Sequence, residues 1–227
     1  MTAPTITAPQ VKTRACLLWA LILALGTYAS YVFHIFDNNI FAYFYYGNLK
    51  RLFYCEFVAA YLFVLLPVLR KKIEAQTGVK VMPVKHPPFT LGRKAVLYVM
   101  TLVPILLMAI SLGYRFKIVY LLGDRIAAVT AVCNAAGALM LAAKLFVAVY
   151  AIFLVQAGVE KLLGKESIIP FGGIFAALTF GLLEWLTEPS RFSLLYVGLF
   201  VYVGILALVS KRRFGVTYAL SVVLYLL

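Results

Sequence analysis

Long apolar runs, separated by short polar or basic connections, recur along the whole chain. A helix of about 20 apolar residues is long enough to cross the hydrocarbon core of a membrane. The pattern therefore predicts an all-α fold, a polytopic transmembrane helix bundle that forms one integral membrane domain over residues 1–227. We expect about seven helices, or six if the last apolar run, 216–227, does not span the membrane.

The boundaries of these helices follow from charges, turn residues and run lengths. Residues 1–14 are expected to be a flexible N-terminus, 70–94 a basic cytoplasmic loop, and 114–125 an interfacial turn or short surface helix. As a helix, segment 127–163 would be about 55 Å long, so it either tilts and projects from the bilayer or breaks near 134–137. We favour one spanning helix around 138–156 that extends at both ends. The predicted helices are 15–36, 52–69, 95–113, 127–163, 171–185, 192–209 and 216–227.

Segment 171–185 has the most informative helix face. Gly173, Ala177 and Gly181 are spaced by four residues, which places them on one side of a helix where neighbours can pack closely. In a regular α-helix Glu184 would lie within about 20° of the same line. A carboxylate inside a membrane is costly and usually faces a bundle interior or a wet cavity. Glu184 is therefore the candidate catalytic residue, proton carrier or cation ligand, or else a structural acid that pairs with Lys144 or lies at headgroup depth.

The composition excludes a water-soluble domain, because 64% of the residues are hydrophobic and the mean hydropathy is +0.99. The net charge of +13 does not indicate nucleic-acid binding, since the basic residues lie in the short connections. With the N-terminus in the cytoplasm, the inner segments hold fourteen Lys and Arg and the outer segments hold six. We expect an integral protein of a bacterial cell membrane, with anionic lipid headgroups bound at Arg70, Lys71, Lys72, Lys211, Arg212 and Arg213.

Four further polar residues fall within or near the predicted spans and are candidate binding residues. Lys144 could pair with Glu184 or snorkel towards the interface. Asn134 and Gln156 are expected to join helices through hydrogen bonds more often than to bind a ligand. Glu160 is expected at the inner surface beside Lys161. The sequence predicts no metal site and no cofactor.

The last third, about 148–227, carries several motifs in a particular order. Val-Gln-Ala-Gly-Val-Glu-Lys-Leu-Leu-Gly occupies 155–164, Phe-Gly-Leu-Leu-Glu occupies 180–184, and a glycine-containing run, a basic turn and a closing apolar run follow. This layout resembles the CAAX-protease and bacteriocin-processing (CPBP) family of intramembrane proteases. The family's catalytic residues are absent: its glutamate pair falls near Ala151 and Ile152, its arginine near Gln156, and its first histidine at Glu184. The resemblance thus implies a non-catalytic member that acts as a membrane scaffold.

Three functional hypotheses remain open at this point. The first is a non-catalytic scaffold or partner subunit that binds another membrane protein, with the lipid bilayer as its other partner. The second is a CPBP-type intramembrane endopeptidase with atypical catalytic residues, among them Glu184. The third is a small-molecule transporter or substrate-binding membrane subunit that uses Lys144 and Glu184.

Overall fold

A computed structural model describes residues 12–29, 47–82, 88–111, 128–187 and 191–226. In these residues every regular element is helical, which confirms the all-α prediction. Within the described ranges, seven helices result when α7, η2 and α8 are counted as one continuous helix, and seven is also the number that the sequence predicted. The elements are α1 (Thr13–Ala29), α3 (Gly47–Thr77), α4 (Leu91–Ser111), α6 (Ala128–Leu163), α7 (Phe171–Ala176), η2 (Ala177–Gly181), α8 (Leu182–Thr187), α9 (Arg191–Val209) and α10 (Phe214–Leu226).

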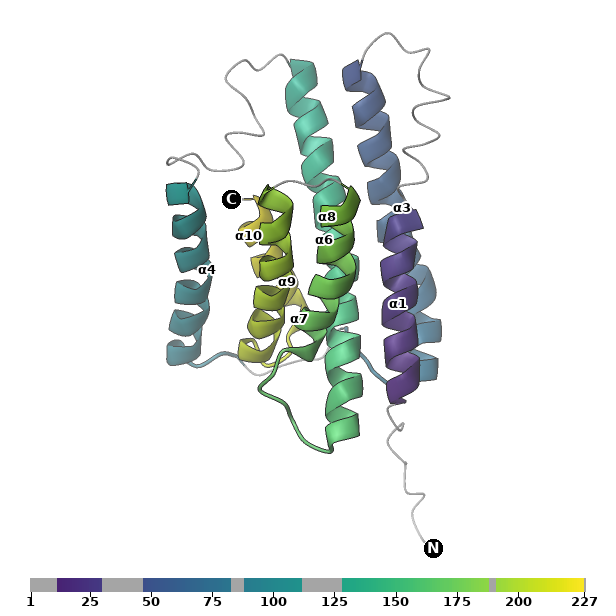
Figure 1. Cartoon of the computed structure of the whole chain (residues 1–227), viewed down its shortest axis with the longest axis vertical. Helices are drawn as coiled ribbons and strands as arrows, with labels where there is room; N and C mark the ends of the chain where they lie inside the picture. The colour runs from purple at the N-terminus through teal and green to yellow at the C-terminus, as the bar shows by residue number, and fades with distance from the viewer. Residues whose placement is uncertain (1–11, 30–46, 83–87, 112–127, 188–190, 227) are drawn as a thin grey trace, which may run out of the picture.

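Helix α6 occupies the centre of the bundle (Figure 1), where α1, α3, α7 and α10 all contact it. It is apolar on all sides, and such a helix is stable only when neighbours or lipid surround it. Nearly every side chain from Ala143 to Val155 is accordingly buried or half-buried. Among the described residues, one stretch, Ala135–Leu163 of α6, is long and apolar enough to cross a membrane. Four further apolar helices are 10–17 residues long.

The structure confirms one continuous helix in the ambiguous region and finds no break near 134–137. Helix α6 has 36 residues, which corresponds to about 54 Å. The second predicted helix was wrong at its C-terminal end, because the basic triplet 70–72 does not terminate α3. Arg70 forms an ion pair with Glu74 one turn later, at 2.6 Å, which supports another turn of helix. The helix ends where Gly78 adopts a φ of 73° and its N–H donates to the Glu74 carbonyl.

Helix 171–187 departs from the regular geometry that the sequence analysis assumed. Residues Ala177–Gly181 form a π-helical turn, η2, in which hydrogen bonds span five residues instead of four. Such a turn shifts everything after it by about one residue, or about 100° around the axis. The predicted alignment of Glu184 with Gly173, Ala177 and Gly181 therefore does not hold. The side chain of Glu184 itself lies outside the described residues.

The predicted small-residue face is confirmed as a contact surface, and α9 covers it. A Cβ atom added to Gly173 would lie 2.8 Å from Gly204 Cα, and one added to Gly181 would lie 2.9 Å from Val197 Cα. Gly172 instead faces α6, where an added Cβ would lie 2.1 Å from the Ile152 carbonyl oxygen. The adjacent pair Gly172 and Gly173 thus lets α7 approach two helix backbones at once.

We predict that Gly172→Ala lowers the free energy of unfolding by about 1–3 kcal/mol, because the new methyl group collides with backbone rather than with a movable side chain. Thermal unfolding in detergent, followed by circular dichroism, measures the change. Gly198→Ala in α9 is the matched control, since an added Cβ there meets no atom within 4 Å. It should stabilise the protein by up to about 1 kcal/mol. If the two substitutions changed the free energy of unfolding equally, the close approach of α7 to the α6 backbone at Gly172 would be contradicted.

Candidate functional site

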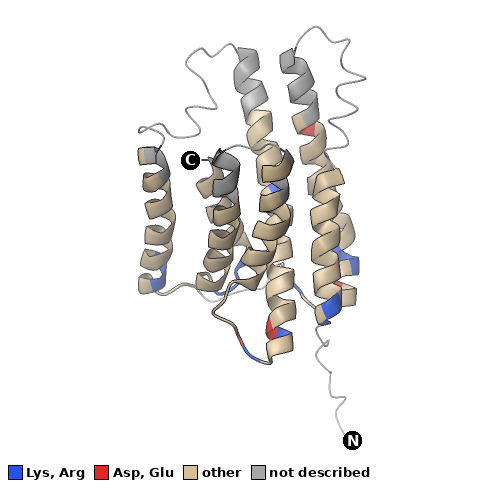
Figure 2. Cartoon of the chain, in the orientation of Figure 1, with Lys and Arg blue, Asp and Glu red and all other residues tan. Residues whose placement is uncertain are grey.

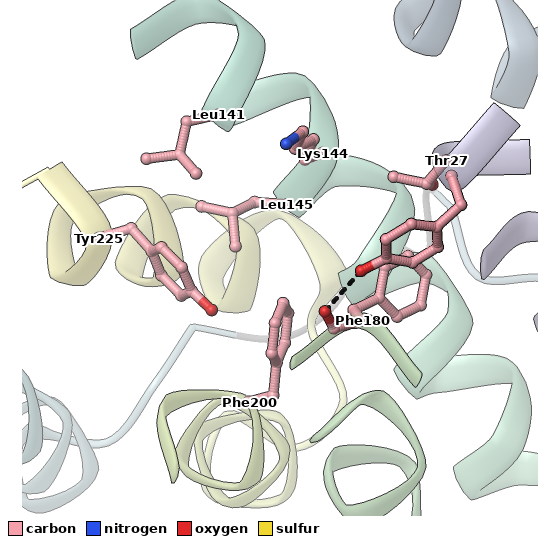
Figure 3. Close-up of a pocket in the computed structure, with 8 residues that line it drawn as sticks. Thr27, Leu141, Lys144, Leu145, Phe180, Phe200 and Tyr225 are labelled. Carbon is pink, nitrogen blue, oxygen red and sulfur yellow. Dashed lines mark hydrogen bonds between the residues drawn. The ribbon is translucent and has the colours of Figure 1, made fainter. Parts of the chain in front are cut away.

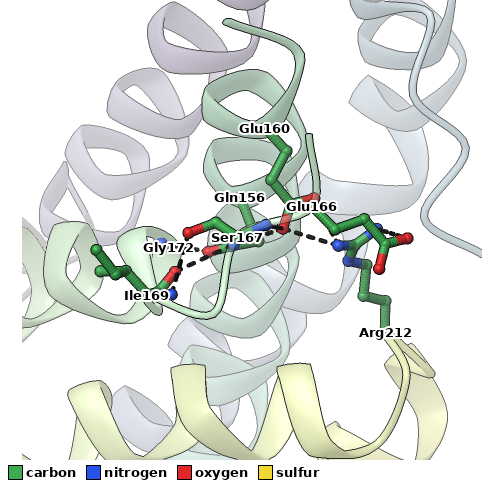
Figure 4. A network of polar contacts seen from close by, with 7 residues as sticks. All are labelled: Gln156, Glu160, Glu166, Ser167, Ile169, Gly172 and Arg212. Atoms are coloured by element: carbon green, nitrogen blue, oxygen red, sulfur yellow. Dashed lines mark hydrogen bonds and ion pairs between the residues drawn. The ribbon is translucent and has the colours of Figure 1, made fainter. Parts of the chain in front are cut away.

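The polar residues that the structure brings together lie at one end of the bundle, where α6 ends and α7 begins (Figure 4). Gln156, which is buried, lies in the last turns of α6. Its Oε1 accepts a hydrogen bond from the Gly172 backbone N–H at 3.1 Å, and its Nε2 donates to the Ile169 carbonyl at 3.3 Å. Pro170, the N-cap of α7, offers no side-chain cap, so Gln156 satisfies a backbone donor that the helix start leaves open. The prediction that Gln156 joins helices is confirmed.

Glu160 is the centre of this network. Its carboxylate accepts from Gln156 Nε2 at 2.7 Å and from the Ser167 backbone N–H at 3.2 Å, and Arg212 Nη2 lies 2.7 Å from both carboxylate oxygens. Only 8% of the Glu160 side chain is exposed, so within the protein this carboxylate is buried, while its expected depth at the inner membrane surface stays a prediction. A buried carboxylate is tolerated when it is paired and hydrogen-bonded, and Arg212 supplies the opposite charge.

Arg212 was assigned to lipid headgroups on sequence grounds, and in the structure it also forms ion pairs within the protein. It bridges buried Glu160 to exposed Glu166, 3.4 Å away on the 164–170 connection. The turn that presents Arg212 is a Schellman-type helix end: the Arg212 N–H donates to the Ala207 carbonyl, and the Lys211 N–H donates to the Leu208 carbonyl. Lys211 and Arg212 have φ values of 52° and 58°, a conformation that glycine adopts far more readily.

Lys144 lies near a second, smaller site (Figure 3), which is a cavity of about 10 Å³ in the middle of the bundle. That volume is close to the space that one water molecule needs. The Tyr28 hydroxyl donates to the Phe180 carbonyl at 2.7 Å, which joins α1 to the π-helical turn beside the cavity. The other lining residues are Thr27, Leu141, Leu145, Phe200 and Tyr225.

Other predicted residues are placed only in part. Asn134 lies in α6 and Glu184 in α8, but both side chains fall outside the described ones, so their pairing and chemistry stay predictions. Arg70, assigned to lipid, binds Glu74 and donates to the Met82 carbonyl at 2.6 Å. Of the remaining basic residues assigned to lipid, Lys71 is exposed and Lys72 lies 5.9 Å from the Trp19 ring, both within α3. Arg213 lies in the turn after α9, 3.6 Å from the Phe89 ring.

Sequence reasoning missed the partner of Glu160 and the backbone groups around it. Arg212 is 52 residues away in the chain, and no local spacing connects the two. The basic triplet 211–213 resembles any cluster of charges that flanks a membrane helix, so the sequence gives no sign that Arg212 pairs with Glu160. Comparison with known proteins adds no further guide, because no family model, no curated protein and no solved structure matches the chain.

We predict that Arg212→Gln destabilises the protein by about 3–5 kcal/mol, because it leaves the buried Glu160 carboxylate without its counter-charge. The double variant Glu160→Gln/Arg212→Gln should recover part of this loss. The control is Glu166→Gln, which removes the charge of the other, exposed partner of Arg212. Because 87% of the Glu166 side chain is accessible, this substitution should cost less than about 1 kcal/mol. Chemical unfolding in detergent measures the stability of the two single variants and of the double variant. If the two single losses simply add up to the loss in the double variant, the pairing of Glu160 with Arg212 is contradicted.

A separate prediction concerns Tyr150, whose ring is fully buried in α6. Its hydroxyl finds no hydrogen-bond partner within the described part of the chain, and an unsatisfied buried hydroxyl is costly. Tyr150→Phe should therefore leave stability unchanged or raise it by about 1 kcal/mol. A loss of more than that amount on thermal unfolding would reveal a partner for the hydroxyl. Tyr218→Phe is the control expected to lose stability, since the Tyr218 hydroxyl donates to the Ala142 carbonyl at 3.1 Å.

Proposed function

We propose that this chain is a polytopic integral membrane protein whose charged end faces the cytoplasm. Figure 2 supports this placement: among the residues that it colours, Lys and Arg gather at the end of the bundle where α1 and α4 begin and α3 and α6 end, and few charged residues lie along the helix bodies. Contacts tie these segments together, because the Lys12 N–H donates to the Thr77 carbonyl and Thr13 Oγ1 donates to the Gly158 carbonyl. The segments that the positive-inside rule assigns to the cytoplasm thus share one end.

The outward surfaces of the bundle support the same proposal. Large apolar side chains are exposed along α1 and α4, a pattern that water disfavours and that lipid or a protein partner would cover. On α4 the exposed fractions include 59% for Val99, 57% for Leu102 and 62% for Leu107. Helix α4 has about the length that a hydrocarbon core requires, since its 21 residues extend for about 31 Å.

We further propose that the protein is a non-catalytic subunit that binds another membrane protein. One observation carries this proposal. Gln156 and Glu160, the polar residues of the protease-like motif 155–164, hold α6, the 164–170 connection and the turn after α9 together. The positions that correspond to the glutamate pair of the CPBP proteases, Ala151 and Ile152, are buried among apolar side chains. Groups engaged in this way support a structural role better than water activation.

Transport by way of Lys144 is the less favoured alternative. Lys144 does line a cavity, but about 10 Å³ accommodates one water molecule rather than a metabolite, whose sites usually measure about 300–1,000 Å³. An endopeptidase with atypical catalytic residues would have to rely on Glu184, a residue whose side chain lies outside the described part of the chain.

Helix α4 offers the surface for the partner. The small-residue face Gly173–Gly181 is already occupied by α9, so it is not available to another chain. Helix α4 contacts α9 and α10 through a small core of Leu97, Ile105, Leu206 and Leu224, and most of its other described side chains are exposed. A single membrane helix packed along this exposed side would complete the bundle.

We predict that a second membrane protein co-purifies in a one-to-one ratio after mild-detergent extraction from the native membrane. Leu102→Trp/Leu106→Trp on the outward side of α4 should lower that ratio at least about fivefold, because the larger rings prevent close helix packing. Leu18→Trp/Leu25→Trp on the outward side of α1 is the matched control and should leave the ratio unchanged. Quantitative mass spectrometry of the purified complex gives the ratio. Recovery of the chain alone, with no stoichiometric partner, would overturn this function.

A further inference from the structure

An open groove of about 570 Å³ lies at the charged end of the bundle, beside the buried network, with which it shares Glu166, Ser167 and Arg212. Four segments that are distant in the sequence form it: the start of α4, the 164–170 connection, the last turns of α9 and the turn after α9. Its volume falls within the roughly 300–1,000 Å³ of sites that bind small molecules. The lining residues are Arg93, Glu166, Ser167, Ile168, Ile205, Leu208, Val209, Lys211 and Arg212.

The groove has a basic part and an apolar part. Arg93, Lys211 and Arg212 contribute three positive charges against the single negative charge of Glu166, which already lies 3.4 Å from Arg212. Since Glu160 and Glu166 both engage Arg212, Arg93 and Lys211 provide the positive charge that faces an incoming anion. Ile205, Leu208 and Val209 form an apolar wall on α9, next to the apolar contact between α4 and α9.

The backbone holds the basic part in place. Lys211 and Arg212 both adopt the left-handed conformation, and the Schellman-type hydrogen bonds to Ala207 and Leu208 fix the turn against the end of α9. The ion pair between Arg212 and buried Glu160 anchors the same turn to α6. The backbone of Lys211 is therefore held in place against α6 and α9, so this part of the groove is preformed.

We infer that this groove binds one anionic phospholipid, with its phosphate between Arg93 and Lys211 and an acyl chain along the α9 wall. Charge complementarity favours an anionic headgroup over a zwitterionic one, and the apolar wall favours a ligand with an acyl chain over free phosphate. The inference rests on the proposed membrane location, because the groove must lie at headgroup depth. It adds a specific, single-lipid site to the diffuse attraction that basic connections exert on a membrane surface.

Native mass spectrometry of the full chain in detergent tests this site with phosphatidylglycerol and with phosphatidylcholine of the same acyl chains. We expect one phosphatidylglycerol to be retained per chain, at least about tenfold more tightly than phosphatidylcholine. Arg93→Gln/Lys211→Gln should weaken that retention at least about tenfold. Lys71→Gln/Lys80→Gln removes the same charge from exposed residues at the same end but outside the groove, and should have no effect.

Two further measurements separate the possible sources of binding. Leu208→Trp fills the apolar part without changing the charge, and should weaken phosphatidylglycerol retention while glycerol phosphate binding stays unchanged. Equal retention of the two lipids, an equal loss in the Lys71/Lys80 control, or displacement of the lipid by glycerol phosphate at equal concentration would each overturn the inference. Carbonate extraction of membranes tests the proposed location independently, so a chain released by carbonate refutes the membrane proposal whatever the lipid result.

Discussion

The ion pair between Glu160 and Arg212 is the interaction on which the charged end of the bundle depends. A carboxylate that is 8% exposed requires a counter-charge and hydrogen-bond donors, and three separate segments supply them. Meeting that requirement fixes the end of α6, the 164–170 connection and the turn after α9 relative to one another. Gln156 then extends the arrangement to the first turn of α7. The buried ion pair and its hydrogen bonds thus hold the end of α6, the end of α9 and the start of α7 in place.

A second constraint acts on the apolar interior, where helices approach as closely as backbone allows. Gly172 and Gly173 place α7 against Ile152 of α6 on one side and Gly204 of α9 on the other. On another face of α6, an added Cβ at Gly158 would lie 2.9 Å from Cys16 Cβ of α1. Close packing of this kind stabilises helix pairs even where lipid removes the hydrophobic driving force between them. The polar end and the close-packed middle together suit a bundle that is surrounded by hydrocarbon and ends at charged headgroups.

For the described residues, the sequence predicted the helical class, the number of helices and the single long helix α6, because each depends on run length and local composition. It also placed Gly173 and Gly181 on a contact face, which needs only a spacing of four. It failed where the outcome depends on tertiary contact: the π-helical turn at 177–181, the continuation of α3 past its basic triplet, and the inward turn of Arg212. The groove was invisible for the same reason, since Arg93 and Lys211 are brought together only by the packing of α4 beside α9. For Glu184 and Asn134, whose side chains lie outside the described ones, the predictions stand as they were made.

The most direct test of the central claim, that the bundle crosses the membrane with its charged end in the cytoplasm, is thiol labelling from one side. In a chain whose Cys16, Cys55 and Cys133 are replaced by alanine, Lys165→Cys marks the charged end and Asn38→Cys marks the first predicted outer connection. A membrane-impermeant maleimide applied to intact cells should label Asn38→Cys, and it should label Lys165→Cys only after the membrane is opened. Labelling of Lys165→Cys in intact cells, or equal labelling of the two positions under all conditions, would contradict the account.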